Sequence, residues 1–145
     1  AAKYKNARWI CGTAAHLPVQ DNSVGLLMSM FALTVPEEFR RVLNQEGIFI
    51  QVLAAQDHLM GLKSIIYPEI LRKDKDSVPT IEGFSLVESV PVRFDSTAEG
   101  EQIGHLLSMT PHFWRISAEG ARRLEQTQVL NDTASCVVNV YRVKC

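Results

Sequence analysis

The stretches VGLLMSMF at residues 24–31, PEEFRRVL at residues 36–43 and GIFIQVL at residues 47–53 decide the fold class of this 145-residue chain. The first is an almost continuous apolar run, which is typical of a parallel strand covered on both faces. Pro36 followed by two acidic residues is typical of the first turn of a helix. Gly47 ends that helix, and a second apolar strand follows. This strand–helix–strand order predicts an α/β protein with a parallel sheet.

Further elements are expected on either side of this unit. Asp57 is the expected cap of the helix after the second strand, and Pro68 is expected to kink that helix. Ser117 is the expected cap of a later helix. The last two strands are expected to form an antiparallel edge of the sheet. The ranges are strands at 8–14, 84–94 and 136–143, and helices at 58–72, 99–109 and 118–127.

Composition limits the classes of function. The chain carries 15 basic and 16 acidic residues and a formal net charge of −1, so a nucleic-acid contact must come from a local patch. No apolar run approaches the roughly 20 residues of a membrane span. The three cysteines lack metal-ligand spacing, so no metal site is expected. With no secretory leader visible, these features favour a cytoplasmic protein that binds no membrane.

Two segments resemble class I methyltransferases. Residues 12–24 end a short strand in small residues and continue through Leu17-Pro18 and a polar turn into the next apolar strand. In those enzymes such a segment leads into the fourth strand. Residues 38–47 resemble the helix and turn before the fifth strand, with Gln45-Glu46 in place of the first half of the usual Pro-Gly-Gly turn.

A narrower resemblance covers nearly the whole chain. The motifs HLMGLK at 58–63, IY at 66–67, EGF at 82–84 and MTPHFWR at 109–115 resemble the guanine-N1 methyltransferases of large-subunit ribosomal RNA. This resemblance implies a Rossmann-like class I sheet, S-adenosyl-L-methionine as the cofactor, and ribosomal RNA as the partner of the full-length protein. The implied reaction is methyl transfer to N1 of a guanine.

Two features of that family are not found in these 145 residues. One is the four-cysteine zinc module, and the other is the pair of first strands with the glycine-rich loop and the acidic ribose ligand. We therefore expect an N-terminally truncated sheet that lacks its first two strands. On this interpretation, residues 1–145 are the C-terminal part of a single methyltransferase domain.

The resemblance also implies a cofactor site. Thr13 and Ala14 would lie against the adenine, at the sheet edge where open α/β sheets bind ligands. Met30 and Phe31 would flank the methyl donor and the target base, and His58 would contact the cofactor. The alternatives are a tightly packed loop for the first pair, core positions for the second, and a surface or capping role for His58.

Trp114 and Arg115 are the expected substrate-binding residues. A tryptophan beside an arginine in a loop can clamp an extruded base by stacking and cation–π contact. The alternative is a tryptophan packed against the helix at 118–127. A further set of basic residues is expected on a solvated face, with phosphate contact as the alternative: Arg72, Lys73, Lys75, Arg122 and Arg123.

The catalytic residue is not identified by the sequence. Methyl transfer from a sulfonium needs the nucleophile, methyl carbon and sulfur in line, and guanine N1 must also lose a proton. Asp95, Glu69 and His112 are equal candidates for the base. Two other functions stay open: a methyltransferase of the same fold acting on a small molecule, and a non-catalytic fragment that forms a homodimer through free strand edges.

We predict that the 145-residue chain alone binds S-adenosylmethionine weakly or not at all, because it has no glycine-rich loop to bring the backbone close to the cofactor. Isothermal titration calorimetry of the purified chain measures this directly. A dissociation constant in the micromolar range or below would contradict the prediction.

Overall fold

The computed structural model describes residues 5–70 and 76–144 and divides into two compact units. The first unit holds the described residues up to 52, together with 79–89 and 139–144, and the second holds the others. Both helices and strands are present, so the predicted α/β class is confirmed. The elements are β1 (Val24–Met30), α1 (Pro36–Val42), β2 (Leu43–Ala54), α2 (Met60–Ile66), β3 (Phe84–Glu99), α3 (Glu101–Ser108), the 3-10 helix η1 (Pro111–Arg115), α4 (Ala118–Gln126) and β4 (Val129–Val143).

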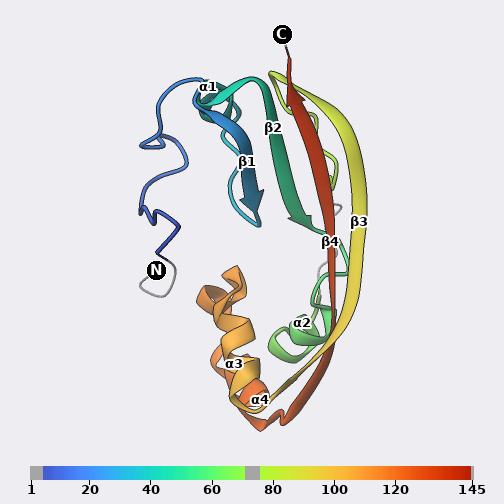
Figure 1. Ribbon diagram of the computed structural model, residues 1–145. Helices are drawn as coiled ribbons and strands as arrows, with labels where there is room; N and C mark the ends of the chain where they lie inside the picture. Colours follow the sequence, from blue (N-terminus) through green and yellow to red (C-terminus); the bar gives the residue numbers. More distant parts are fainter. Residues whose placement is uncertain (1–4, 71–75, 145) are drawn as a thin grey trace. The chain divides into compact units, whose positions relative to one another are not determined.

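The described strands form one sheet in the order β1-β2-β4-β3 (Figure 1). β1 pairs with β2 in parallel, with Leu26 opposite Ile48 and Met30 opposite Val52. The connection between them is α1, so β1-α1-β2 is the parallel strand–helix–strand unit predicted from the sequence. The expectation that Gly47 ends the helix was wrong, because α1 ends at Val42 and Gly47 lies within β2. It is also the building block of a Rossmann-like sheet.

The last two strands pair in antiparallel fashion. The Ser89 hydroxyl on β3 donates to Asn139 on β4, and the Thr97 hydroxyl donates to Asn131. Residue numbers therefore fall along one strand as they rise along the other. The antiparallel edge is confirmed, and both strands are longer than predicted because polar segments expected to be loops continue the pairing.

Aromatic residues form the core of the first unit. The Phe49 ring from β2 stacks on Tyr141 of β4 at 5.7 Å between ring centroids, and it meets Phe39 of α1 edge-on at 5.2 Å. The Tyr141 hydroxyl donates to the carbonyl of Pro79 at 2.8 Å, so its polar end is satisfied inside the core. This core fixes α1 against the sheet.

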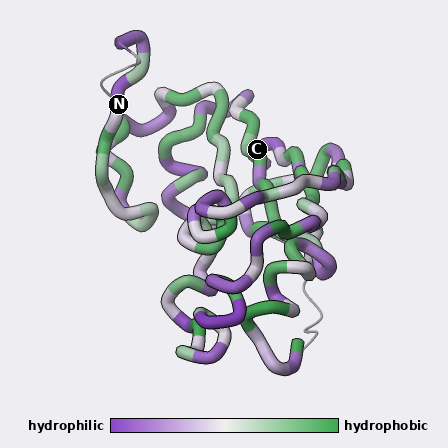
Figure 2. Tube along the Cα trace, turned by 90° about the horizontal axis from the view of Figure 1, so that it is seen from below, coloured by the Kyte–Doolittle hydropathy of each residue, from purple (hydrophilic) through white to green (hydrophobic). Residues whose placement is uncertain are grey.

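Leucine and isoleucine at helical spacing form the core of the second unit. Leu62 and Ile66 share one face of α2, and Ile103 and Leu107 share one face of α3. Leu124 of α4 joins the same buried cluster. Apolar and polar segments alternate along the trace (Figure 2), as expected when each element buries only one face.

The helix predicted at 58–72 is shorter than expected, and its expected cap was wrong. Within the described residues α2 begins at Met60 and ends at Ile66, before Pro68. The amides of Gly61 and Leu62 donate to the Asp132 carboxylate, at 2.9 and 2.7 Å. A carboxylate from β4 therefore satisfies the helix start, and Asp57 does not.

The strand predicted at 8–14 was wrong. Residues 8–12 have no regular structure, and Thr13 makes only an isolated bridge to His16. The Trp9 side chain is 61% exposed. A short apolar run needs a neighbouring strand to satisfy its backbone, and no strand in the described part of the chain pairs with this segment.

The expectation that residues 24–31 are covered on both faces was also wrong. Leu26, Met28 and Met30 are each more than half exposed, whereas Val24 and Leu27 pack against the aromatic core. β1 lies at the edge of the described sheet and is covered on one side only. The apolar run therefore presents a row of side chains to solvent.

We predict opposite stability changes at two helical glycines. A Cβ at Gly120 in α4 would lie 2.4 Å from the Ile66 carbonyl oxygen, so Gly120→Ala should destabilise the protein by about 1–3 kcal/mol. A Cβ at Gly104 in α3 meets no atom within 4 Å. Gly104→Ala should therefore stabilise it by about 0.5–1 kcal/mol. Urea unfolding of both variants checks this, and changes of the same sign would contradict it.

Candidate functional site

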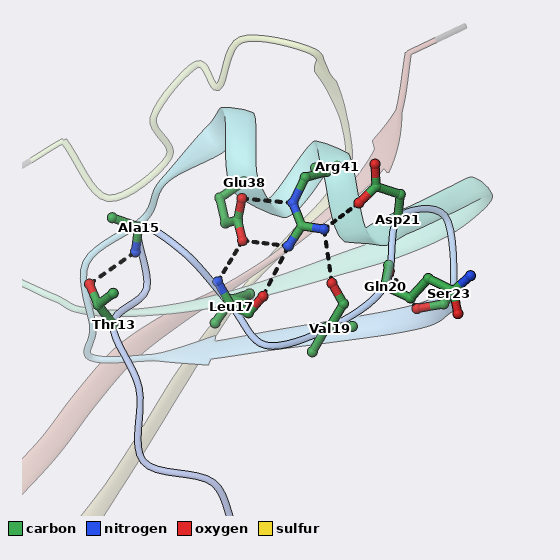
Figure 3. A network of polar contacts seen from close by, with 9 residues as sticks. All are labelled: Thr13, Ala15, Leu17, Val19, Gln20, Asp21, Ser23, Glu38 and Arg41. Atoms are coloured by element: carbon green, nitrogen blue, oxygen red, sulfur yellow. Dashed lines mark hydrogen bonds and ion pairs between the residues drawn. The ribbon is translucent and has the colours of Figure 1, made fainter.

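Arg41 on α1 organises the loop that leads into β1 (Figure 3). Its guanidinium donates to both Glu38 carboxylate oxygens, at 2.7 and 2.9 Å. It also donates to the Leu17 carbonyl at 3.0 Å, to the Val19 carbonyl at 2.8 Å and to the Asp21 carboxylate. One side chain thus binds residues 17, 19 and 21, and we call this set of contacts the Arg41 clamp.

Glu38 completes the clamp. Its carboxylate is almost fully buried and also accepts the Leu17 backbone N–H. The hydrogen bonds from Arg41, together with that backbone N–H, lower the pKa of Glu38 from its ordinary value of 4.5 to about 2. The same carboxylate raises the pKa of Arg41. Both groups are therefore charged at neutral pH, and the clamp is a charge-assisted network.

The clamp fixes the Leu-Pro turn that directly follows the predicted adenine contacts. The Ala15 amide donates to the Thr13 hydroxyl at 3.2 Å, and the His16 amide donates to the Thr13 carbonyl. Thr13 is exposed and Ala14 is half-buried. These residues lie in an open turn rather than in a packed loop, so a ligand can reach them.

Met30 and Phe31 lie at the carboxyl end of β1. Their side chains are 56% and 55% exposed, so the alternative that they are core residues is wrong. The Phe31 amide donates to the Val52 carbonyl at 2.9 Å, and Phe31 has a φ of +51°. A left-handed conformation costs a phenylalanine about 1–3 kcal/mol, and such strain is concentrated at functional sites.

A row of buried polar residues, not predicted from the sequence, crosses the sheet at the position before Met30. Ser29 on β1 is paired with Gln51 on β2, and both are buried. Gln51 donates to the Thr34 hydroxyl at 2.8 Å, in the loop after Phe31. Asn139 on β4, fully buried, donates to Gln51 at 3.5 Å and accepts from Ser89 on β3 at 2.7 Å. We call Ser29, Gln51 and Asn139 the polar row.

The polar row has a sequence signal. Ser29, Gln51 and Asn139 are single polar residues inside otherwise apolar runs. Buried polar groups are costly unless they are hydrogen-bonded, so three such interruptions indicate a network. The bond between Gln51 and Thr34 ties the loop after Phe31 to the sheet.

His58 lies in the turn after β2, in the second unit. Its Nδ1 accepts the Ser135 backbone N–H at 3.1 Å, and its own amide donates to the Ala55 carbonyl at 3.2 Å. The neighbouring Asp57 contacts Arg93, and hydrogen bonds from Ser135 and Arg93 lower the pKa of Asp57. The ring of His58 is thus anchored to β4 by one of its nitrogens.

Trp114 and Arg115 belong to η1 in the second unit, and both side chains are exposed. Trp114 is 85% exposed, so the alternative that it packs against the helix at 118–127 is wrong. Its ring meets that of Phe113 edge-on, with 5.0 Å between centroids. His112 precedes them and is bonded to the Tyr67 hydroxyl through its Nδ1, at 2.9 Å.

The predicted site residues fall into two groups. Thr13, Ala14, Met30 and Phe31 belong to the first unit, and the other three belong to the second: His58, Trp114 and Arg115. The structure brings Met30 and Phe31 together at one strand end. Arg72, Lys73 and Lys75 lie outside the described residues.

Two of the three candidate bases are engaged within the second unit. Asp95 accepts a hydrogen bond from the Thr133 hydroxyl at 2.7 Å, beside an open hollow of about 420 Å³ that is lined by residues of β3 and β4. His112 is bonded to Tyr67, and Glu69 is exposed.

Within residues 5–70 and 76–144, no group of His, Cys, Asp and Glu could hold a metal ion. Each helix in this part of the chain is too short or too polar to cross a bilayer.

Three curated proteins are similar to this chain in sequence, whereas no family model matches it. YxjB of Bacillus subtilis, provisionally named a 23S rRNA guanine-N1 methyltransferase, is 29% identical over 127 residues, which are 85% of this chain and 45% of the relative. The 23S rRNA (guanine(748)-N1)-methyltransferase of Streptomyces fradiae is 25% identical over 83% of this chain and 45% of the relative. A provisionally named 23S rRNA guanine-N1 methyltransferase of Micromonospora griseorubida is 38% identical over 53 residues, 37% of this chain and 18% of the relative.

The chain spans about 45% of the length of the first two relatives. The resemblance to guanine-N1 methyltransferases that the motifs predicted is confirmed by these similarities. Among solved structures, the YcgJ protein of Bacillus subtilis matches with a TM-score of 0.47 and 14% identity, over 99% of this chain and 74% of that one.

We predict that the Arg41 clamp weakens in acid. Because Arg41 and Leu17 lower the pKa of Glu38 to about 2, its stabilising contribution is fully present above about pH 4.5 and is lost as the pH falls toward 2. Glu38→Gln should lower stability at pH 7 and flatten the pH dependence of the unfolding free energy between pH 4.5 and 2. Urea unfolding across this range measures both effects, and an unchanged slope would contradict the assignment.

Proposed function

We propose that this chain is part of an S-adenosylmethionine-dependent methyltransferase that methylates N1 of a guanine in 23S ribosomal RNA. The named relatives support the reaction, and the parallel β1-α1-β2 unit supports the fold. Residues 1–145 would be the C-terminal part of a single methyltransferase domain. An enzyme with this substrate would act in the cytoplasm, and the proposal requires no homodimer.

The main support for this function is the conformation and the exposure of the residues at the end of β1. Phe31 holds a left-handed backbone conformation there, and its ring and the Met30 side chain are more than half exposed. A strained phenylalanine beside an exposed methionine at the carboxyl end of a parallel strand fits the ligand edge of an α/β sheet. We propose that Met30 and Phe31 bind the methionine part of the cofactor and the target base.

The remaining cofactor contacts follow from position. We propose that Thr13 and Ala14, in the open turn held by the Arg41 clamp, lie against the adenine. We assign His58 to a further cofactor contact, since it lies in the turn after the carboxyl end of β2. In this arrangement the contact would be oriented by the bond from the Ser135 backbone N–H to His58 Nδ1.

The bound cofactor would supply an electrophilic methyl group on a sulfonium. The task of the protein is to hold guanine N1 in line with that carbon and to exclude water. Phe31 can restrict the base by ring contact, and Gln51 keeps the loop after Phe31 in place through Thr34. Trp114 and Arg115 are proposed to bind the RNA substrate.

The reaction is tested with the full-length protein, labelled S-adenosylmethionine and a 23S ribosomal RNA transcript. We expect label in 1-methylguanosine after digestion and mass spectrometry. Label only in a small molecule, or in another nucleoside, would overturn the assigned substrate. No transfer under conditions in which the cofactor binds would overturn the assigned reaction.

We predict that Phe31→Gly separates stability from activity. Glycine accepts a φ of +51° without strain, and the lost ring is 55% exposed, so the free energy of unfolding should stay the same or rise by up to about 1 kcal/mol. Methyl transfer should nevertheless fall at least about tenfold, since a positioned ring contact is lost. Leu33→Ala, in the same loop and also exposed, is the matched control and should change neither quantity. Full activity of Phe31→Gly would contradict the site.

A further inference from the structure

The most exposed aromatic surface in the described part of the chain lies on η1. Trp114 is 85% exposed and Phe113 is 43% exposed, and their rings meet at an interplanar angle of 87°. Met109, at the end of α3, is also exposed. Large apolar side chains gathered on a surface indicate a binding site. We call Phe113 and Trp114 the aromatic pair.

The backbone under the aromatic pair is held firmly. The Thr110 hydroxyl donates to the Leu107 carbonyl at 2.8 Å and accepts the His112 amide at 3.3 Å, which caps η1. The bond between Tyr67 and His112 ties η1 to the residue that follows α2. A rigid support means that little conformational entropy is lost when a ligand binds.

Exposed arginines accompany the aromatic pair. Arg115 directly follows Trp114, and Arg122 lies on α4; both are exposed. Arg123 is bonded to Glu119 and to the Ile65 carbonyl. The two exposed guanidinium groups can attract the phosphates of a polyanion.

Thr110 and His112, on the N-terminal side of the aromatic pair, already have protein partners. Thr110 bonds Leu107 and His112, and His112 bonds Tyr67. Stacking needs only a π-face, which every base has, so recognition by the two rings would tolerate any sequence.

We propose that the aromatic pair is a stacking site for an unpaired RNA nucleotide of any sequence, distinct in role from the recognition of the target guanine. The ring of Trp114 stacks on the base, Phe113 supports that ring edge-on, and Arg115 and Arg122 attract the phosphates. A base inside a duplex is covered on both faces and cannot stack there. The inference rests on the proposed function for the choice of RNA as the ligand.

The test is fluorescence anisotropy of a labelled ten-nucleotide RNA that contains no guanine, titrated with the full-length protein. We expect Trp114→Ala to weaken binding by about 5- to 150-fold, the range for loss of one stacked base. Trp114→Phe should restore most of the affinity, whereas Trp114→Leu should not, because it keeps apolar volume without a π-face. Trp9→Ala is the matched control, an exposed tryptophan elsewhere, and should bind as the parent does.

The same RNA annealed to its complement should bind more weakly, and the Trp114 variants should not change that binding. An unchanged thermal midpoint of Trp114→Ala, expected from the exposure of the ring, shows that a loss of affinity is not unfolding. Parent-like binding by Trp114→Ala, equal dependence of duplex binding on Trp114, or no binding of the guanine-free RNA would each overturn the proposal. Guanine-free binding without methylation of 23S ribosomal RNA would instead overturn the proposed function and leave the stacking site standing.

Discussion

The bidentate ion pair between Arg41 and Glu38 is the interaction on which the first unit depends. The loop before β1 has no regular structure, so its backbone polar groups need partners from elsewhere. Arg41 supplies them to the Leu17 and Val19 carbonyls, and Glu38 supplies one to the Leu17 amide. Because both charges sit on one turn of α1, the packing of α1 by Phe39 also positions the loop. The open turn at Thr13 and the start of β1 are thereby fixed to the same helix.

The Arg41 clamp holds the loop before β1, and the polar row holds the loop after it. Gln51 and Asn139 are buried and bonded to each other, and Gln51 reaches Thr34 beyond the strained residue Phe31. A left-handed phenylalanine persists only when its surroundings over-determine it. The anchored loop and the bond from the Phe31 amide to Val52 provide that constraint. The proposed cofactor site therefore lies on a strand whose two ends are held by polar contacts in addition to the packing of Val24 and Leu27 against the aromatic core.

Local patterns in the sequence predicted the elements but not their partners. Apolar runs and a proline gave the β1-α1-β2 unit, and Ser117 does cap α4 through the Gly120 amide, because these features depend on neighbouring residues. The cap of α2 comes instead from Asp132, about 70 residues further along the chain, which no local pattern can indicate. The polar row is visible as three interruptions of apolar runs. Only the strand order shows that they share one row, and the exposure of Trp114 likewise required the packing of η1.

We propose above all that S-adenosylmethionine binds at the carboxyl end of β1. The chain contains four methionines, of which Met28 and Met30 lie on the exposed face of β1, Met109 is exposed in the second unit, and Met60 begins α2. NMR spectra of the full-length protein with methyl-labelled methionines, recorded with and without S-adenosylmethionine, monitor all four of these side chains in one experiment. The account predicts a large shift of the Met30 resonance and little change at Met109. A saturating cofactor that leaves Met30 unshifted would contradict it.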